Sequence, residues 1–389
     1  MRVFAEYMTT LPVINTHSHH LPPWQRPVRL PEHLANSYVG WRELAFDTPE
    51  ARAISFGQLR AHAPFVWWAK GLQAAWDMEQ PLTAASWAAY EDKATTLHQD
   101  EGFDRQLLAR CNYERVLLDA YNNPGYDNAD NLYSPVLRVN SFLYGYNSIA
   151  KDHNNNNPFQ LYSLEVDTLE DYIEAMERVV LQKQRSGCVA LKAALPYDRG
   201  LDMDTVDMET ARGVFGRRDV TPAEEKAFGD FIFGELCRIA AETQLPMQIH
   251  TGLGMLYKSN PMQLLGVINR FSDTRFVLFH GGFPWTDEMP GLLFNHNNVY
   301  ADLCWLPQLS PTAAVQFVRV ALEAGLSDRI TWGCDTWTAE ESMGALMAGR
   351  WVVAKALDAM VEDGYLGEAD ACAVARMIMA DNARGLYGL

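Results

Sequence analysis

The sequence predicts an α/β fold, a (β/α)8 TIM-like barrel with a large helical insertion after its first strand. Eight short runs rich in Val, Ile, Leu and Phe are spread along the 389 residues, which is typical of parallel strands buried on both faces. Longer stretches with helical spacing of apolar residues separate most of these runs. Eight strands that alternate with helices indicate a (β/α)8 barrel.

The first predicted strand is close to the N-terminus, and the other seven follow Cys111. We expect strands at Val13–His17, Tyr113–Ala120, Val136–Leu143, Cys188–Ala194, Pro246–Gly252, Arg275–Gly282, Asn298–Trp305 and Arg329–Trp337. Because the strands of such a barrel are parallel, their carboxyl ends meet at one rim, where active sites of this fold are built.

Three helices between the strands have clear start signals. Asp167 and Glu170 have the spacing of a capping box, and apolar residues then recur at helical intervals. Thr221 and Pro222 give an N-cap and a first helical position. Ser310-Pro311 begins another helix, for which Gly325 is a suitable end.

The segment from about residue 20 to 110 is too long for one strand–helix unit. It combines helical patterns with many aromatic residues, including Trp41, Trp67, Trp68, Trp76 and Trp87. One interpretation is an insertion that covers the mouth of the barrel, since substrate pockets of barrels are formed by such segments. The other is a packing element or a dimer contact, and the two are compatible. We expect a single domain over residues 1–389.

The charge balance excludes some classes of partner. The formal net charge is −17, whereas nucleic acid and anionic membranes are bound by clustered Lys and Arg. The six cysteines form no CxxC pair, so neither a disulfide framework nor a thiolate zinc site is indicated. With no signal-peptide pattern and no long apolar run, we expect a cytoplasmic protein that acts on a small molecule. A homodimer is plausible.

Chemically reactive side chains gather at the carboxyl ends of the predicted strands. Three of the ten histidines follow the first strand in the stretch INTHSHHLP. The residues placed at the same rim are His17, His19, Lys192, His250, His280 and Asp335. His20 breaks the alternation of the strand, and no role is assigned to it.

Each of these residues also has a purely structural interpretation. A single histidine at a strand end is more often a hydrogen-bonded core residue than a ligand, Lys192 could be solvated, and Asp335 could cap the next helix. Their common position at one rim favours a shared role. Residues i and i+2 of a strand point the same way, so His17 and His19 can hold one ion. Imidazole and carboxylate suit Zn²⁺ and related divalent ions.

With these residues the chain resembles the amidohydrolase superfamily of metal-dependent barrels. It is most similar to the amidohydrolase-related branch, which includes the amidohydrolase-like domain of nodulin/glutamine-synthetase fusion proteins. The resemblance rests on NTHSHH, QIHTGLG, FVLFHGGFPW and ITWGCDTW, with further likeness in ALKAALPYDRGL and the terminal DNARGLYGL. It extends from residue 13 to the end of the chain, apart from the insertion.

The resemblance implies a role for each residue. The metal ligands would be His17, His19, His250 and Asp335. Asp335 would also accept a proton, and His280 would polarise or bind the substrate. A single Zn²⁺ is favoured, and two ions are expected only if Lys192 is carboxylated and bridges them.

Arg199, in YDRGL after the fourth strand, would bind a substrate carboxylate. A surface ion pair with Asp198 or Asp202 is the alternative for this arginine.

We therefore predict a metal-dependent hydrolase in which an activated water cleaves an amide or lactone of a small carboxylated substrate. A decarboxylase or a uronate-isomerase-like enzyme on the same barrel is the alternative. The long insertion is similar to that of the isomerases, but CDTW lacks the Ser-Arg tail expected there. A non-catalytic barrel is a third reading, opposed by the complete set of ligand positions.

Overall fold

The computed structural model describes residues 2–121 and 130–389. Within these residues eight strands follow the order of the chain in one sheet, and the pairings between neighbours are parallel. The fold is the predicted (β/α)8 barrel. The strands are β1 (Val13–Ser18), β2 (Tyr113–Leu118), β3 (Tyr133–Arg138), β4 (Ala190–Ala193), β5 (Met247–Ile249), β6 (Phe276–Leu278), β7 (Val299–Asp302) and β8 (Ile330–Thr331).

Helices separate the strands along most of the chain. They are α1 (Arg2–Thr10), α2 (Leu30–Ala35), α3 (Pro49–Leu59), α4 (Ala63–Ala75), α5 (Trp87–Leu97), α6 (Phe103–Arg110), α7 (Pro158–Leu161), α8 (Leu169–Arg185), α9 (Met208–Arg212), α10 (Pro222–Thr243), α11 (Leu265–Arg270), α12 (Met289–Asn295), α13 (Leu306–Leu309), α14 (Pro311–Glu323), α15 (Ala339–Glu362), α16 (Glu368–Arg376) and α17 (Asn382–Tyr387). Of these, α2 to α6 lie between β1 and β2. That they cover the barrel mouth stays a prediction, as does the single domain.

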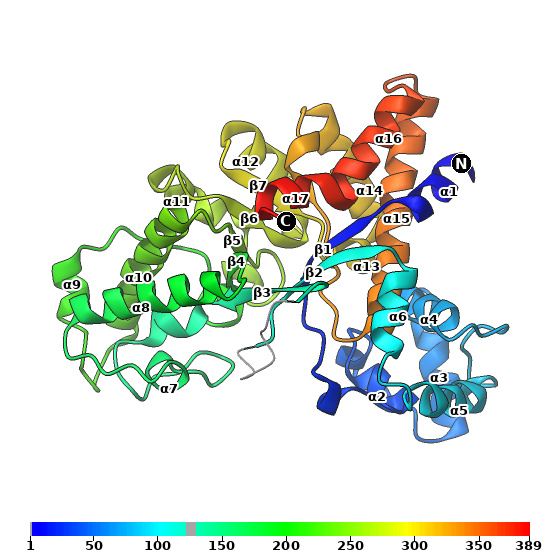
Figure 1. Cartoon of the computed structure of the whole chain (residues 1–389), viewed down its shortest axis with the longest axis horizontal. Coiled ribbons are helices and arrows are strands. Elements are labelled where there is room, and N and C mark those ends of the chain that lie inside the picture. Colours follow the sequence, from blue (N-terminus) through cyan, green and yellow to red (C-terminus); the bar gives the residue numbers. More distant parts are fainter. Residues whose placement is uncertain (1, 122–129) are drawn as a thin grey trace. The chain divides into compact units, whose positions relative to one another are not determined.

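The chain forms two compact units. The first comprises Met1–Leu118, Leu303–Glu323 and Thr331–Asp381. In it β1 pairs with β2, and α15 packs against α4 and α6 (Figure 1). The backbones of α4 and α15 meet at two glycines, because a Cβ on Gly71 would lie 2.6 Å from the amide nitrogen of Gly344 and 2.8 Å from the carbonyl oxygen of Glu340. Side chains at these positions would push the two helices apart.

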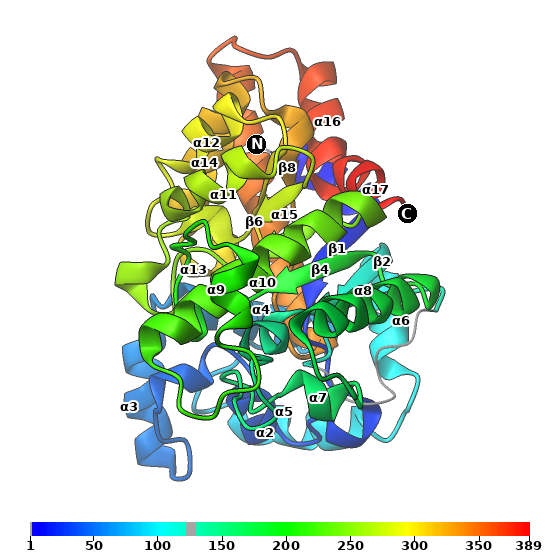
Figure 2. The same cartoon turned by 90° about the vertical axis from the view of Figure 1, so that its left-hand side faces the viewer.

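The second unit comprises Asp119–Asp302, Ala324–Ile330 and Asn382–Leu389. Strands β3 to β7 form its parallel sheet, in which Lys192 is in register with Arg138 on one side and Gln248 on the other. Figure 2 shows α8 and α10 beside each other on this sheet, and they are in contact. Their interior is aromatic: Tyr172 and Phe228 are fully buried, and burial of such side chains contributes strongly to the stability of the unit.

The predicted strands are in the right places, but all of them except the first, which was predicted to end one residue too early, are too long at their carboxyl ends. The run predicted to Gly282 ends as a strand at Leu278, because His280 and Gly281 have φ values of 64° and 54° and turn the chain out of the sheet. The run predicted to Trp337 contains only the two residues of β8. Apolar residues continue into the loops because the loops are themselves buried.

Two of the predicted helix starts are correct, and one is displaced by a residue. Thr221 caps α10 in a complete capping box with Glu224, and Pro311 begins α14. The helix predicted from Asp167 is capped by Thr168, whose hydroxyl accepts the amide of Asp171. The predicted N-cap is therefore one residue too early, because Thr and Asp are both good N-cap residues.

Candidate metal centre

Strand β1 presents two histidines to the same side in the first unit. His17 lies in the strand and His19 directly follows its end, and their Nε2 atoms are 3.3 Å apart. Both side chains are almost fully buried. Asn15 fixes the strand end, since its side-chain nitrogen donates to Ser18 Oγ at 2.8 Å and its oxygen accepts the Cys334 amide at 2.8 Å. The i, i+2 relation expected for the two histidines is present.

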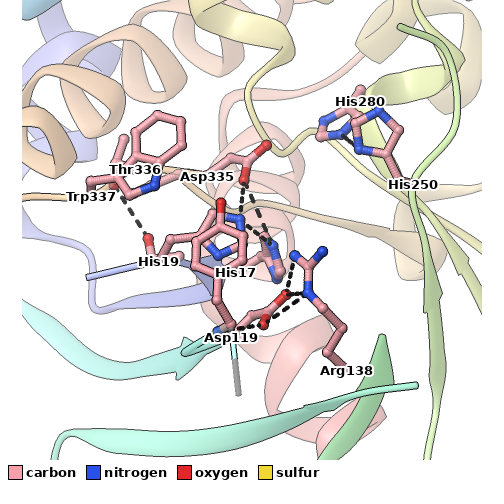
Figure 3. Close-up of polar contacts among 12 residues, drawn as sticks. His17, His19, Asp119, Arg138, His250, His280, Asp335, Thr336 and Trp337 are labelled. Carbon is pink, nitrogen blue, oxygen red and sulfur yellow. Dashed lines mark hydrogen bonds and ion pairs between the residues drawn. The ribbon is translucent and has the colours of Figure 1, made fainter. Parts of the chain in front are cut away.

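Asp335 completes a three-residue cluster with these histidines. Its Oδ1 atom lies 3.6 Å from His17 Nε2 and 3.1 Å from His19 Nε2 (Figure 3). The backbone of Asp335 has a φ of 60°, a left-handed conformation that is rare outside glycine and is found disproportionately at functional sites. The structure thus brings together three of the four ligands that the sequence predicted.

The backbone on either side of Asp335 is bound closely to β1. The amides of Cys334 and Asp335 both donate to the His17 carbonyl oxygen, at 3.2 and 2.9 Å, and the His19 amide donates to the Thr336 carbonyl oxygen at 2.8 Å. Gly333 permits this approach, because a Cβ there would lie 2.6 Å from Thr16 Oγ1. The glycine in the sequence WGCD is therefore a requirement of the site.

A chain of hydroxyl groups next to the cluster was missed in the sequence. Ser342 Oγ lies 2.6 Å from Thr336 Oγ1 and 2.7 Å from His20 Nε2, and Thr336 Oγ1 lies 3.3 Å from Ser18 Oγ. Burial lowers the pKa of His20 to about 4, so this imidazole is neutral at pH 7. His20, which had no predicted role, supports the strand end through Ser342.

A buried carboxylate holds the loop after Asp335. Glu341 accepts the amide of Trp337 at 3.0 Å and the amide of Tyr38 at 3.3 Å. Burial raises the pKa of Glu341 to about 8, and the charge of Asp335 adds to this effect. The Trp337 ring in turn stacks on His19, with ring centroids 5.9 Å apart.

Aromatic residues extend from this loop. The rings of Tyr38 and Trp305 stack with centroids 4.0 Å apart, and Trp41 packs edge-on against both while 58% of it is exposed. Part of the segment 20–110 therefore contacts the loops that carry the cluster in the first unit. Of these three rings only that of Trp41 is exposed, since Tyr38 and Trp305 are buried.

In the second unit, two predicted site histidines contact each other. His250, just after β5, and His280, just after β6, have ring nitrogens 3.0 Å apart and are buried (Figure 3). The Tyr197 ring covers His250 with centroids 4.7 Å apart. The loops are joined by the hydroxyl of Thr251, which donates to the Phe279 carbonyl oxygen at 2.7 Å. The structure pairs these histidines as expected for neighbouring strand ends.

Lys192 is in the strand position that the sequence predicted. Its side chain is 2% exposed, so the solvated interpretation is wrong, and its Nζ lies 3.6 Å from the centre of the Phe279 ring. A cation over an aromatic face is stabilised by the ring quadrupole. Carboxylation of this lysine stays a prediction.

A buried ion pair in the second unit was also missed. Arg138 at the end of β3 donates three hydrogen bonds to Asp119, from Nε to both carboxylate oxygens at 3.3 and 3.0 Å and from Nη2 to Oδ2 at 2.7 Å, and both residues are buried. Burial alone would lower the pKa of Arg138, but the charge and hydrogen bonds of Asp119 outweigh it and raise the pKa. Asp119 lies late in its predicted strand, whereas Arg138 is the third residue of the run predicted as Val136–Leu143, so the predicted strand ends did not indicate this pair.

Arg199 has a protein partner that the sequence did not indicate. Its guanidinium forms an ion pair with Asp230 on α10 and donates to the Lys226 carbonyl oxygen at 3.2 Å. Neither Asp198 nor Asp202 is the partner in these contacts. Asp198 instead accepts the backbone amide of His153. Binding of a substrate carboxylate by Arg199 stays a prediction.

A barrel with histidines and an aspartate at its strand ends defines the class of metal-binding (β/α)8 enzymes. Residues 193–389 match the amidohydrolase family model. The chain belongs to this family, as the sequence motifs predicted, and family membership supports an enzyme. The matched region contains Asp335, His250 and His280, whereas His17 and His19 precede it.

Two characterised relatives match parts of the chain. Protein fluG of Emericella nidulans is 34% identical over 166 residues, which are 38% of this chain and 19% of fluG. A uronate isomerase of Nostoc punctiforme is 25% identical over 136 residues, 34% of this chain and 27% of that protein. The matches thus span about a fifth and about a quarter of the relatives' own lengths.

Solved structures share the whole fold. The uronate isomerase of Thermotoga maritima has a TM-score of 0.79 at 15% identity, covering 99% of this chain and 96% of that one. A candidate metal-dependent hydrolase of Lactobacillus casei has a TM-score of 0.71 at 19% identity, covering 99% and 97%. At these identities the likeness concerns the fold. Among residues 2–121 and 130–389, no helix is both long and apolar enough to span a membrane.

Proposed function

We propose that the protein is a metal-dependent hydrolase that cleaves an amide or lactone bond of a small, carboxylated substrate. The observation that carries this proposal is the convergence of His17 Nε2, His19 Nε2 and Asp335 Oδ1 in a buried cluster. Membership of the amidohydrolase family supports it, because the region that matches the family model includes Asp335.

The spacing of the three ligand atoms fits a divalent ion. Zn²⁺ binds imidazole nitrogen and carboxylate oxygen at about 2.0–2.2 Å, which in a tetrahedral site separates neighbouring ligand atoms by about 3.3 Å. The three separations here are 3.3, 3.6 and 3.1 Å. Zn²⁺ is accordingly our proposed ion. Such an ion polarises a carbonyl oxygen and makes water acidic enough to ionise near neutral pH.

The protein's own groups then direct the proton transfers. Asp335 is our proposed proton acceptor, and its carboxylate is held in place by its backbone hydrogen bond to His17. Glu341 positions the loop through the amide of Trp337. The roles of His250 as a further ligand and of His280 toward the substrate stay predictions from the resemblance, as do those of Lys192 and Arg199.

A second candidate function is isomerisation of a uronic acid. The curated relative from Nostoc punctiforme is a uronate isomerase, and its match to this chain is the observation that favours this reaction. A carboxylated sugar also satisfies the substrate class proposed above. The two reactions differ in their products, since hydrolysis consumes water and isomerisation leaves the formula of the substrate unchanged.

Product analysis of the metal-loaded protein separates the reactions. We would incubate it with carboxylated amides, lactones and uronic acids and record products by mass spectrometry and by NMR, which distinguishes an aldose from a ketose of equal mass, with Asp335→Asn as the control. Addition of one water, lost in the variant, supports the hydrolase. Aldose–ketose conversion without mass change supports the isomerase, and release of CO₂ would show a decarboxylase. No conversion of any substrate by a fully metal-loaded protein would oppose all three.

A further inference from the structure

A second cluster of metal-ligating side chains lies in the first unit, on other elements than the first. His33 is in the last turn of α2, His98 directly follows α5, and Glu340 is in the first turn of α15. The two Nε2 atoms are 2.9 Å apart, and Glu340 Oε1 lies 2.9 Å from His98 Nε2 and 3.9 Å from His33 Nε2. All three side chains are buried at 0–1% exposure.

The surrounding structure aims these groups at one another. Glu340 is placed by the close approach of α4 to α15, where Gly71 leaves room for the Glu340 carbonyl oxygen. The indole of Trp76 donates to Glu340 Oε1 at 3.2 Å and packs edge-on against His33. The Arg26 guanidinium donates to the His98 carbonyl oxygen at 2.8 Å. Every member of the cluster is thus positioned by a neighbour.

The close approach of the two imidazoles requires either a hydrogen or a metal ion between their facing nitrogens. Two neutral imidazoles whose Nε2 atoms are 2.9 Å apart require a proton shared between them or an ion bound to both lone pairs. Within the described residues, the Nδ1 atoms of His33 and His98 have no hydrogen-bond partner. Nothing in that part of the chain therefore prevents both Nδ1 atoms from carrying the protons and both Nε2 atoms from acting as ligands.

The charges near the cluster also favour a cation. Glu340 and Asp104 bring two carboxylates, while Arg26 supplies one positive charge at 3.5 Å from Asp104 Oδ2. Asp104 Oδ1 is buried and has no hydrogen-bond partner among residues 2–121 and 130–389. The two carboxylates outnumber the single positive charge of Arg26, and a divalent ion bound to Glu340 would balance them.

We propose that His33, His98 and Glu340 bind a second divalent cation, Zn²⁺ by their chemistry, separate from the cluster at His17, His19 and Asp335. The ligand separations of 2.9, 2.9 and 3.9 Å bracket the value of about 3.3 Å for tetrahedral zinc. The ion connects α2 and the end of α5, both in the segment 20–110, to α15. Its role is structural: it holds this aromatic-rich segment in place.

The first test measures metal content with the proposed cluster intact. In the variant with His17→Asn and Asp335→Asn, the first cluster loses two ligands, and His33, His98 and Glu340 are unchanged. After dialysis against Zn²⁺ and gel filtration, elemental analysis should find one zinc per chain. A zinc content of zero in this variant, with its fold intact, would overturn the proposal, because the two imidazoles would then bind only a proton.

The second test removes the proposed ligands. His98→Gln should lower the zinc content of the otherwise unchanged chain by one, and the matched control His62→Gln, in the same segment, should leave it unchanged. Zinc should raise the midpoint of thermal unfolding of the variant with His17→Asn and Asp335→Asn, and adding His98→Gln to this variant should abolish the shift. An equal zinc content in His98→Gln and in the unaltered chain would contradict the proposal. These outcomes do not depend on the reaction catalysed at the first cluster.

Discussion

The backbone amide of Asp335 donates to the carbonyl oxygen of His17 at 2.9 Å, while the carboxylate of the same aspartate lies 3.6 Å from the His17 imidazole. Asp335 therefore holds the end of β1 through its backbone and also places its carboxylate beside the imidazole of His17. The two contacts mean that the distance between the ligands is set by backbone hydrogen bonding and not by side-chain packing alone. This relationship leads to the first prediction.

Asp335→Asn should abolish most activity while leaving the fold intact. The amide keeps the size of the side chain and the backbone hydrogen bond, but it cannot accept a proton and is a weaker ligand. Loss of a general base typically lowers the rate by about 10²–10⁴-fold. The measurement is kcat/KM on the substrate that the product analysis identifies, with circular dichroism as the test of folding. Asp328→Asn, whose side chain is exposed, is the matched control and should retain full activity.

Gly333→Ala should destabilise the protein and weaken metal binding together. The added methyl group would overlap Thr16 Oγ1 at 2.6 Å, and overpacking of this kind costs about 1–3 kcal/mol. The free energy of unfolding in urea and the dissociation constant for zinc are the quantities to measure. Gly291→Ala is the control, because nothing lies within 4 Å of its added Cβ. If both variants unfold at the same urea concentration, the close approach has no energetic role.

Asp119→Ala should be more harmful than removing both members of its ion pair. The substitution leaves the buried Arg138 guanidinium without its bidentate partner, and breaking a buried pair costs about 3–5 kcal/mol. Asp119→Leu combined with Arg138→Met should unfold at a higher urea concentration than Asp119→Ala alone. Additive effects of Asp119→Leu and Arg138→Met, each measured alone and in combination, would show that the two residues are not coupled.

The N-terminus of α10 should contribute to stability in a pH-dependent way. The Thr221 backbone amide and then the Arg217 side chain lower the pKa of Glu224 from 4.5 to about 2. Because the folded pKa is the lower one, this contribution is present above pH 4.5 and is lost as the pH falls toward 2. Glu224→Gln should therefore flatten the dependence of the unfolding midpoint on pH across that window. An unchanged acid slope in the variant would contradict the assignment.

The sequence was sufficient for the strand order and for the grouping of His17, His19 and Asp335, whose role as ligands stays a prediction. Period and composition identified all eight strands, because buried parallel strands are continuously apolar. They could not identify where each strand ends: His280 and Asp335 leave the sheet through positive φ values that residue type alone does not predict.

The second cluster could not have been found in this way. His33 is on α2 and His98 directly follows α5, and neither position shows in the sequence that it will meet Glu340 on α15. Contacts of this kind depend on tertiary packing between distant segments. The pair of Asp119 and Arg138 is intermediate, since the strand-end position of Asp119 was visible in the sequence but its partner and their geometry were not.

The distance along the chain between His17 and Asp335 has a consequence for biosynthesis. His17 is synthesised long before Asp335. A nascent chain that has not yet reached Asp335 therefore presents the two imidazoles without the carboxylate. Since the earlier segments begin to fold as they emerge, the three-residue cluster is completed only after Asp335 has been made and has paired with β1.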